Sequence, residues 1–234
     1  SSGSPFPTQN VLALITEGFS TSKRDRTPET FLKIVRTLYD VFRSSPANVG
    51  VFCASYTVLN SLRMYGIVEA ARKARKKLFI EQSGLSASEN SLLLEDYKSC
   101  GKEENGAVLL GVCGGRNSEG EDFPGTDMTT VVIVGIPYHL PTAKTDATIR
   151  YYDKVFHKKG WVYAYLAPSM QRANQASGRP IRKLDDKGAI IFMDERFADK
   201  QPWISAWLRN RVKTLPEYDL PRLKQVLKSF WHKF

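Results

Sequence analysis

Two arginines in the C-terminal half of the chain lie where they could bind an anion. Arg179 and Arg182 belong to the segment QASGRPIR, at the end of a predicted helix. Gln175 and Arg179 are four residues apart and share a helix face, and the proline after Arg179 disfavours helical geometry there. Two guanidinium groups at one helix end suit a phosphate group. The alternative is a pair of surface arginines bound to Asp185 and Asp186.

A glycine-rich loop, residues 114–127, separates the two most strand-like segments of the chain. Its sequence, GGRNSEGEDFPGTD, carries the carboxylates Glu119 and Asp122 directly after a predicted buried strand. In parallel α/β sheets, ligands bind beyond the carboxyl ends of the strands. The loop could therefore belong to a ligand site. An ordinary surface turn would have the same composition, because Gly and Asp are common turn residues.

Some frequent kinds of site are not encoded. No G-x-x-x-x-G-K-[ST] segment occurs, so no loop is expected to cradle nucleotide phosphates and no lysine to reach the β and γ phosphates. An acidic motif of the D-E-x-H type for magnesium is also missing. The three histidines are scattered, and the three cysteines are widely spaced without a C-x-x-C pair. We predict no metal site in this chain.

Apolar periodicity predicts strands that alternate with helices along the whole chain. Short, continuously apolar runs are typical of buried strands and occur at residues 10–16, 49–53, 78–82, 107–112, 130–136 and 188–193. Amphipathic spacing predicts helices at residues 28–42, 56–65, 69–77, 86–99, 146–156, 168–179, 202–213 and 220–234. This alternation favours a doubly wound α/β domain with a mostly parallel sheet.

Composition narrows the class of protein further. The 234 residues include 34 Lys and Arg against 24 Asp and Glu, a formal net charge of +10. Positive surface charge favours polyanions such as nucleic acid, and the run EAARKARKK (69–77) concentrates it, although a solvated helix face would look the same. A hydrophobic content of 42% excludes global disorder.

The hydropathy of the chain and its first residues indicate where in the cell the protein is expected. No segment approaches the ~20 apolar residues of a membrane-spanning helix, and the first residues lack a signal-peptide pattern. We therefore expect an intracellular protein with no membrane partner. Residues 1–4 (SSGS) are expected to be a vector-derived remnant.

Several segments occur together in the order of a known family. They are GGRNSEGEDFPG, then QRANQASGRPIR, then DKGAIIFMDERF. They resemble motifs five and six, and the following D-x-R-F strand end, of XPD/DinG-type superfamily 2 DNA helicases. The early segments SPFP, NVLALIT and VGVFCASY resemble the start of the second motor domain and motif four. Residues 5–234 thus resemble the helicase C-terminal motor domain.

The resemblance implies a fold and a role for each matching residue. The fold would be a RecA-like (P-loop NTPase-type) α/β domain, with a mostly parallel sheet flanked by helices and a helical insertion. The motif six arginines that contact the γ-phosphate, as arginine fingers worth ~10³ or more in rate, would be Arg179 and Arg182. The other residues on the nucleotide side would be Gln175, Glu119, Gly120 and Asp122. The residues facing DNA would be Ser55, Tyr56, Arg116 and Ser118.

In such helicases two RecA-like domains sandwich ATP and Mg²⁺, and this chain resembles the second domain alone. It is therefore not expected to hydrolyse ATP by itself. The parent would be an ATP-dependent helicase that moves five-prime to three-prime on single-stranded DNA in nucleotide excision repair or a related pathway. Its partners would be single-stranded DNA, the first motor domain and other DNA repair proteins. A 4Fe-4S cluster would belong to the parent's other half, with none in this chain.

Two alternatives stay open at this point. One is a non-enzymatic nucleic-acid-binding domain, in which the arginines and the basic run contact phosphates directly. The other is half of a bacterial DinG-like helicase. Glu121 stands where the family has an apolar residue, which puts the local packing of motif five in question. The compact C-terminal end favours an archaeal source, with the protein in the cytoplasm or nucleoid; a eukaryotic parent would be nuclear.

Overall fold

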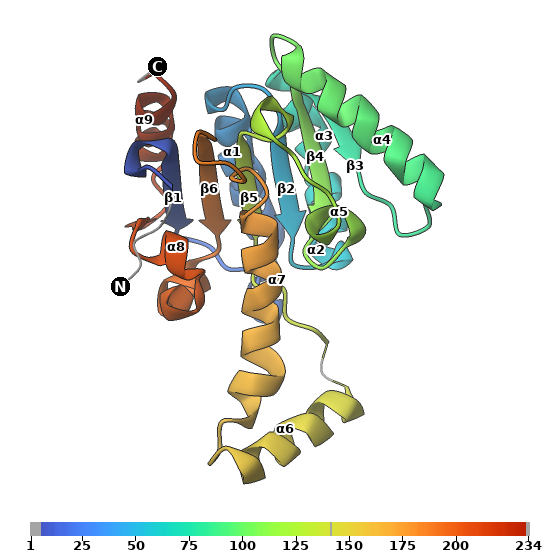
Figure 1. Cartoon of the computed structure of the whole chain (residues 1–234), viewed down its shortest axis with the longest axis vertical. Coiled ribbons are helices and arrows are strands. Elements are labelled where there is room, and N and C mark those ends of the chain that lie inside the picture. Colours follow the sequence, from blue (N-terminus) through green and yellow to red (C-terminus); the bar gives the residue numbers. More distant parts are fainter. Residues whose placement is uncertain (1–5, 141, 233–234) are drawn as a thin grey trace.

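Seven parallel strands form one sheet at the centre of the structure (Figure 1). The computed structural model describes residues 6–140 and 142–232, so the predicted remnant at 1–4 lies outside the described residues. The strands are β1 (Val11–Thr16), β2 (Val49–Cys53), β3 (Lys77–Ile80), β4 (Ala107–Val112), β5 (Thr130–Val134), β6 (Gly188–Met193) and β7 (Val212–Leu215). Their spatial order is β3-β4-β2-β5-β6-β1-β7, and each neighbouring pair is parallel. The predicted α/β class is confirmed.

Helices cover both faces of this sheet (Figure 1). They are α1 (Pro28–Ser44), α2 (Tyr56–Met64), α3 (Ile67–Lys73), α4 (Ala87–Ser99), α5 (Arg116–Glu119), α6 (Ala143–Val155), α7 (Ala167–Ser177), α8 (Ala206–Arg209) and α9 (Leu220–Trp231). Buried side chains of α1, α2, α3 and α9 form one apolar cluster with the sheet, and those of α4, α7 and α8 form another on the opposite face. The last residues of the predicted helix 220–234 lie outside the described part.

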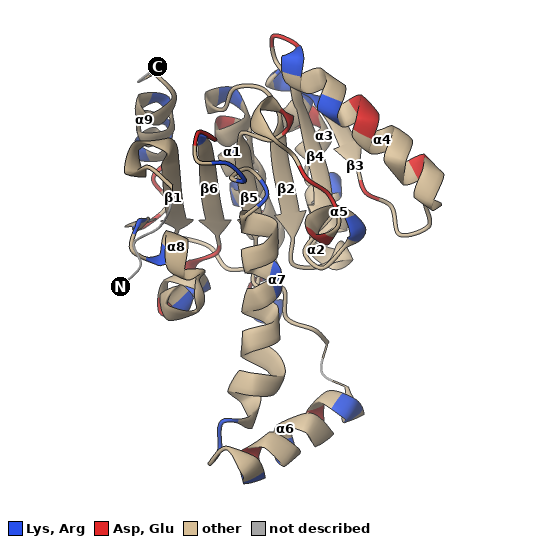
Figure 2. Ribbon diagram, in the orientation of Figure 1, with Lys and Arg blue, Asp and Glu red and all other residues tan. Residues whose placement is uncertain are grey.

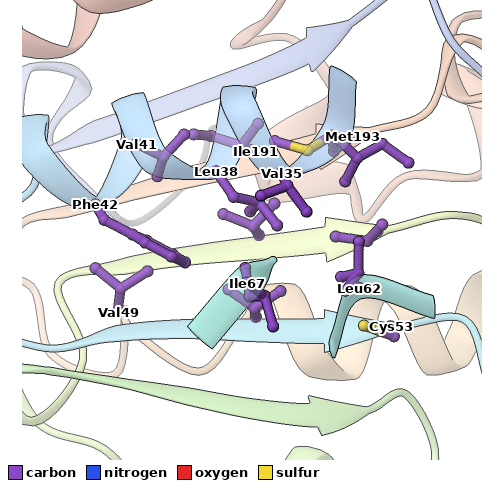
Figure 3. Close-up of a cluster of buried hydrophobic side chains, with 14 of the residues drawn as sticks. Val35, Leu38, Val41, Phe42, Val49, Cys53, Leu62, Ile67, Ile191 and Met193 are labelled. Atoms are coloured by element: carbon purple, nitrogen blue, oxygen red, sulfur yellow. The ribbon is translucent and has the colours of Figure 1, made fainter. Parts of the chain in front are cut away.

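The strands supply side chains to both clusters because successive residues of a strand point to opposite faces. In β2, Val49, Val51 and Cys53 join the cluster beneath α1, whereas Phe52 joins the one beneath α7. Figure 3 shows the first cluster, in which side chains of α1 meet Ile191 and other side chains of the sheet. Burial on both faces explains why these strands appear in the sequence as continuous apolar runs.

Helix starts follow the capping residues that the sequence contains. The Thr27 hydroxyl accepts a hydrogen bond from the Thr30 amide at 3.2 Å, and Pro28 occupies the first helical position of α1, as predicted. In α4, Ser86 and Glu89 cap each other reciprocally. These local signals place both helix starts correctly.

The predicted helix at 202–213 is wrong. A 3-10 segment (Glu195–Trp203) ends there, α8 adds one turn, and Val212 begins the edge strand β7. Within the described residues, strand β7 pairs only with β1, and the two middle residues of β7 are exposed. An edge strand with exposed polar residues lacks the apolar run by which buried strands are recognised.

A helical insertion leaves the body between β5 and β6, as the helicase resemblance implied. It consists of α6, a π-helical turn (Val162–Leu166) and the first part of α7, and it projects beyond the carboxyl ends of the strands (Figure 1). Helix α6 has no buried residue. Within the described residues, each helix is too short or too polar to cross a membrane.

Candidate functional site

The glycine-rich loop 114–127 is ordered by one deeply buried aromatic ring. It begins at the carboxyl end of β4, forms the single turn α5, and returns across the sheet to β5. Phe123 is fully buried and makes an edge contact with Tyr97, with ring centroids 5.9 Å apart. Lys98 lies over the Phe123 ring and also pairs with Glu121 at 3.2 Å. The unusual Glu121 is therefore accommodated as a half-buried ion pair.

Arg179 binds this loop directly. Its Nη1 donates to the Glu121 carbonyl at 2.6 Å, and its Nη2 donates to the Glu119 carbonyl at 2.9 Å. Arg179 is only 6% exposed, and its Nε has no hydrogen-bond partner among the described residues. Burial, followed by the neighbouring charge of Arg182, lowers the pKa of the Arg179 guanidinium. Arg179 thus fixes the loop by binding two of its backbone carbonyls.

Arg182 reaches the same loop but stays in solvent. Its Nη2 lies 3.1 Å from the Asp122 carboxylate, and the two side chains are 42% and 76% exposed. Figure 2 shows the acidic part of the loop in front of β2 and β4, and the basic segment that follows α7 in front of the neighbouring strands β5 and β6. The structure therefore brings Glu119, Asp122, Arg179 and Arg182 into one cluster.

The alternative, in which the side chains of Arg179 and Arg182 pair with Asp185 and Asp186, does not match the side-chain contacts of the described residues. Asp186 instead accepts hydrogen bonds from the backbone amides of Arg182 and Lys183, each at 2.7 Å. These bonds shape the turn after α7 and leave the Arg182 guanidinium free to reach Asp122. Gln175 is exposed on α7, and Gly120 is exposed at the end of α5.

A second group of predicted residues lines a cleft at the carboxyl edge of the sheet. The cleft has a volume of about 610 Å³, and its walls include Ser55, Tyr56, Gly114, Gly115 and Arg172. The Ser55 hydroxyl caps α2 by accepting from the Val58 amide at 3.3 Å. Ser55 and Tyr56 thus line the same cleft as Gly114 and Gly115, the first residues of the glycine-rich loop.

The other two predicted DNA contacts lie differently. Arg116 is exposed, and its Nη1 donates to the Ser86 carbonyl at 3.3 Å. Ser118 is fully buried, and its hydroxyl donates to the Gly115 carbonyl at 3.0 Å. In this arrangement Ser118 shapes the turn α5, and its side chain does not face the cleft.

A buried carboxylate, Glu81, lies beside Tyr56 and Gly115, two of the residues that line the cleft. The Tyr56 hydroxyl donates to Glu81 Oε1 at 3.1 Å. Burial raises the pKa of Glu81, whereas hydrogen bonds from Tyr56 and Asn117 lower it. Burial and the nearby Glu81 carboxylate raise the pKa of Tyr56 to about 12. A Cβ atom on Gly115 would overlap Glu81 Oε1 and lie 2.9 Å from the Val112 carbonyl oxygen, so a larger residue here would force these groups to shift.

Sequence reasoning missed Arg172, which also lines the cleft. Its Nη2 donates to the Pro137 carbonyl at 2.7 Å, and its Nη1 lies 2.6 Å from His139 Nε2. Burial and then Arg172 lower the pKa of His139. Arg172 precedes Arg179 by seven residues, about two helical turns, and this spacing could have pointed to it.

A buried ion pair beside the cleft was also missed. Asp194 is fully buried at the end of β6, and its Oδ2 lies 2.7 Å from Arg196 Nη2. Thr21 donates to the same oxygen through its amide and its hydroxyl. The sequence shows Asp194 and Arg196 only as part of the D-x-R-F segment, with no indication that they meet Thr21. Among the described residues, no group of three or more His, Cys, Asp or Glu side chains is placed to hold a metal ion.

A parallel α/β domain in which a glycine-rich loop meets two arginines from the end of a following helix has the arrangement of a helicase motor domain. A family model described as the helicase C-terminal domain matches residues 38–211. The chain belongs to this family, and the predicted helicase resemblance is confirmed.

Known relatives agree with this assignment. The chain is 29% identical over 226 residues to a regulator of telomere elongation helicase 1 homolog from Drosophila grimshawi, a match that covers 91% of this chain and 23% of that protein. It is 29% identical over 245 residues to the ATP-dependent DNA helicase CHL1 of Scheffersomyces stipitis, covering 97% of this chain and 28% of the relative. The chain therefore spans about a quarter of these relatives.

A solved structure titled XPD helicase shares the fold. Its TM-score is 0.64 at 20% sequence identity, and the match covers 88% of this chain and 36% of that one. The sheet and its flanking helices thus form the RecA-like fold expected from the motifs.

Proposed function

We propose that this chain is the second RecA-like motor domain of an ATP-dependent DNA helicase, and that Arg182 faces the γ-phosphate of ATP held by a first motor domain. The observation that supports this most is the exposed guanidinium of Arg182, held on the rim of the loop 119–122. ATP would supply the phosphoanhydride bond whose hydrolysis drives the motor. Negative charge that builds up on the phosphate during hydrolysis needs a fixed positive group beside it.

The Arg182–Asp122 pair fits that role. An exposed ion pair contributes only about 0–1 kcal/mol, so a phosphate can replace Asp122 as the partner of Arg182 at little cost. Meanwhile Asp122 keeps the guanidinium near the loop, which limits the number of conformations that it must give up on binding. This argument favours Arg182 as the arginine finger.

Arg179 has a different role in this proposal. Its guanidinium is buried and already donates to two backbone carbonyls of the loop. Contact with a phosphate would require breaking these bonds. We therefore assign Arg179 to positioning the loop that carries Asp122, in place of the direct γ-phosphate contact that the motif match implied.

The cleft at the carboxyl edge is proposed to hold single-stranded DNA. Ser55 and Tyr56 lie at the N-terminus of α2, where backbone amides favour phosphate, and Arg172 adds a positive charge. The glycine-rich loop begins in this cleft and meets Arg182 at Asp122, so in this proposal it connects the DNA side with the nucleotide side. Movement in the five-prime to three-prime direction, a role in repair, and magnesium or an iron–sulfur cluster on the other half rest on the motif resemblance.

The test uses a protein that joins this chain to its first motor domain. Arg182→Ala should lower kcat for ATP hydrolysis by about 10³-fold while leaving single-stranded DNA binding and the melting temperature unchanged. The matched control is Lys183→Ala, because Lys183 is an exposed neighbour with the same charge. The chain alone should show no ATP turnover.

Two outcomes would contradict the proposal. Appreciable turnover by the chain alone would show that it is not half of a motor. An Arg182→Ala variant that hydrolyses ATP normally but loses most of the salt dependence of DNA binding would favour the non-enzymatic nucleic-acid-binding domain.

A further inference from the structure

The projecting insertion exposes an unusual number of aromatic rings. We call residues 143–166, from the start of α6 to the end of the π-helical turn, the aromatic arm. Four aromatic residues of the arm are between 41% and 62% exposed, namely Tyr151, Phe156, Trp161 and Tyr163. Soluble proteins rarely leave such a group of large apolar side chains in solvent unless it binds something.

The rings support one another in short ladders. Phe156 and Tyr163 lie with ring centroids 4.8 Å apart, and Trp161 and Tyr165 lie 6.0 Å apart. Tyr165 in turn stacks on Tyr138 at 4.9 Å, with the ring planes nearly parallel. These contacts pack the rings against one another and still leave Phe156, Trp161 and Tyr163 partly exposed.

The same arm is positively charged. Its 24 residues include five Lys and Arg and two Asp, a net charge of +3. One of the two acids is used internally, because Asp153 Oδ1 accepts a hydrogen bond from the Gly160 amide at 2.8 Å. Figure 2 shows the basic residues at the start of α6 and in the turn that leads to α7.

The backbone of the arm departs from regular helix where the charges and rings meet. His157 and Lys158 adopt left-handed conformations, with φ of 51° and 65°. Non-glycine residues rarely adopt this conformation, and they concentrate at functional sites. The π-helical turn follows a few residues later and carries Tyr163; such turns are also frequent at functional sites.

The arm is continuous with the proposed DNA cleft. Tyr138, Thr142 and Thr145, at the base of the arm, form one wall of the cleft, and Ser55 and Tyr56 form another. A polymer that lies in the cleft would therefore pass the base of the arm as it leaves.

We propose that the aromatic arm binds single-stranded nucleic acid beyond the cleft, with Trp161 and Tyr163 stacking on bases and Lys158 and Lys159 contacting phosphates. Exposed rings combined with positive charge are the features by which proteins bind single strands without sequence preference. The centre of a protein–protein interface is instead depleted in lysine. This inference rests on the proposed function, because it extends the DNA path of the same site.

Fluorescence anisotropy of a labelled 20-nucleotide oligo-dT, titrated with the 234-residue chain, tests the proposal. Each base–aromatic stack contributes at least about five-fold to the affinity, so the double variant Trp161→Ala/Tyr163→Ala, which removes two stacks, should raise the Kd by at least about 25-fold. The control Trp203→Ala removes a tryptophan of similar exposure, 36% against 43% for Trp161, outside the arm, and should leave the Kd within two-fold. Trp161→Phe keeps a stacking ring and should retain binding.

Salt dependence provides the second measurement. Lys158→Ala/Lys159→Ala should reduce the slope of log K against log salt by about 0.7 for each phosphate that the variant no longer neutralises. A double aromatic variant with an unchanged melting temperature and an unchanged Kd would overturn the proposal, as would an unchanged salt slope. If the unmodified chain does not bind the oligonucleotide, the arm has no such role, whereas the Arg182 experiment still judges the proposed function separately.

Discussion

Asp194 is expected to be the most sensitive polar position in the part of the chain that the structure describes. Its two carboxylate oxygens accept five hydrogen bonds, from the amide and hydroxyl of Thr21 and from the amide, Nε and Nη2 of Arg196, at 2.7 to 3.0 Å. The carboxylate is fully buried. It therefore ties the loop after β1 to the segment after β6.

The substitution Asp194→Asn keeps the shape of this side chain and removes its charge. Asparagine has one acceptor oxygen, and its amide group would face N–H donors such as the Thr21 amide or Arg196 Nε, whereas Arg196 Nη2 also donates to the Thr21 hydroxyl at 3.1 Å. Removing one member of a buried ion pair typically costs 3–5 kcal/mol. The Arg196 side chain is 28% exposed and can regain some hydration, so we expect the lower end, about 3 kcal/mol.

Urea and thermal unfolding of the chain would measure this loss. For a domain of this size, about 3 kcal/mol corresponds to a fall of roughly 6–12 °C in Tm. The matched control is Glu103→Gln, which removes the exposed Lys77–Glu103 pair at 3.0 Å and should change stability by less than about 1 kcal/mol. If Asp194→Asn costs no more than this control, the ion pair does not stabilise the fold and the reasoning is refuted.

Two further outcomes concern the amino-terminal edge of the sheet. Lys76 is buried, and burial lowers its pKa from 10.5 to about 8. Between pH 8 and pH 10.5 the unfolded chain therefore binds more protons than the folded chain, so the free energy of unfolding rises with pH. In urea titrations, the free energy of unfolding of the wild type relative to Lys76→Met should rise by up to about 3 kcal/mol over this range. A difference between the two proteins that does not change with pH would contradict this. Gly106 has a φ of +67°, and a Cβ there would overlap the Ala47 carbonyl. Gly106→Ala should cost about 1–3 kcal/mol in the same assay, whereas Gly84→Ala, where a Cβ meets nothing within 4 Å, should be nearly neutral.

Most of the fold could be predicted because its central strands are buried on both faces. Segments such as Val131–Val134 and Ile190–Met193 are continuously apolar for that reason, and caps such as Thr27 mark the helix starts between strands. Strand β7 escaped prediction because it lies at the sheet edge with a polar, half-exposed sequence. Its place in the sheet depends on pairing with β1, about 200 residues earlier in the chain, and local patterns do not contain this information.

The candidate site was predicted as a set of segments, but the orientation of each side chain was not. The motif order correctly brought residues 119–122 and 179–182 together. The sequence does not indicate which of Arg179 and Arg182 has the exposed guanidinium. Both belong to one motif, and with Pro180 between them either side chain could project from the end of the helix. The packing makes the distinction: Arg179 follows α7 directly and donates into the loop carbonyls, while Arg182 comes after the proline and remains exposed. A guanidinium bound to two carbonyls cannot also present those N–H groups to phosphate, and for that reason our proposal assigns the nucleotide contact to the exposed Arg182 of this pair.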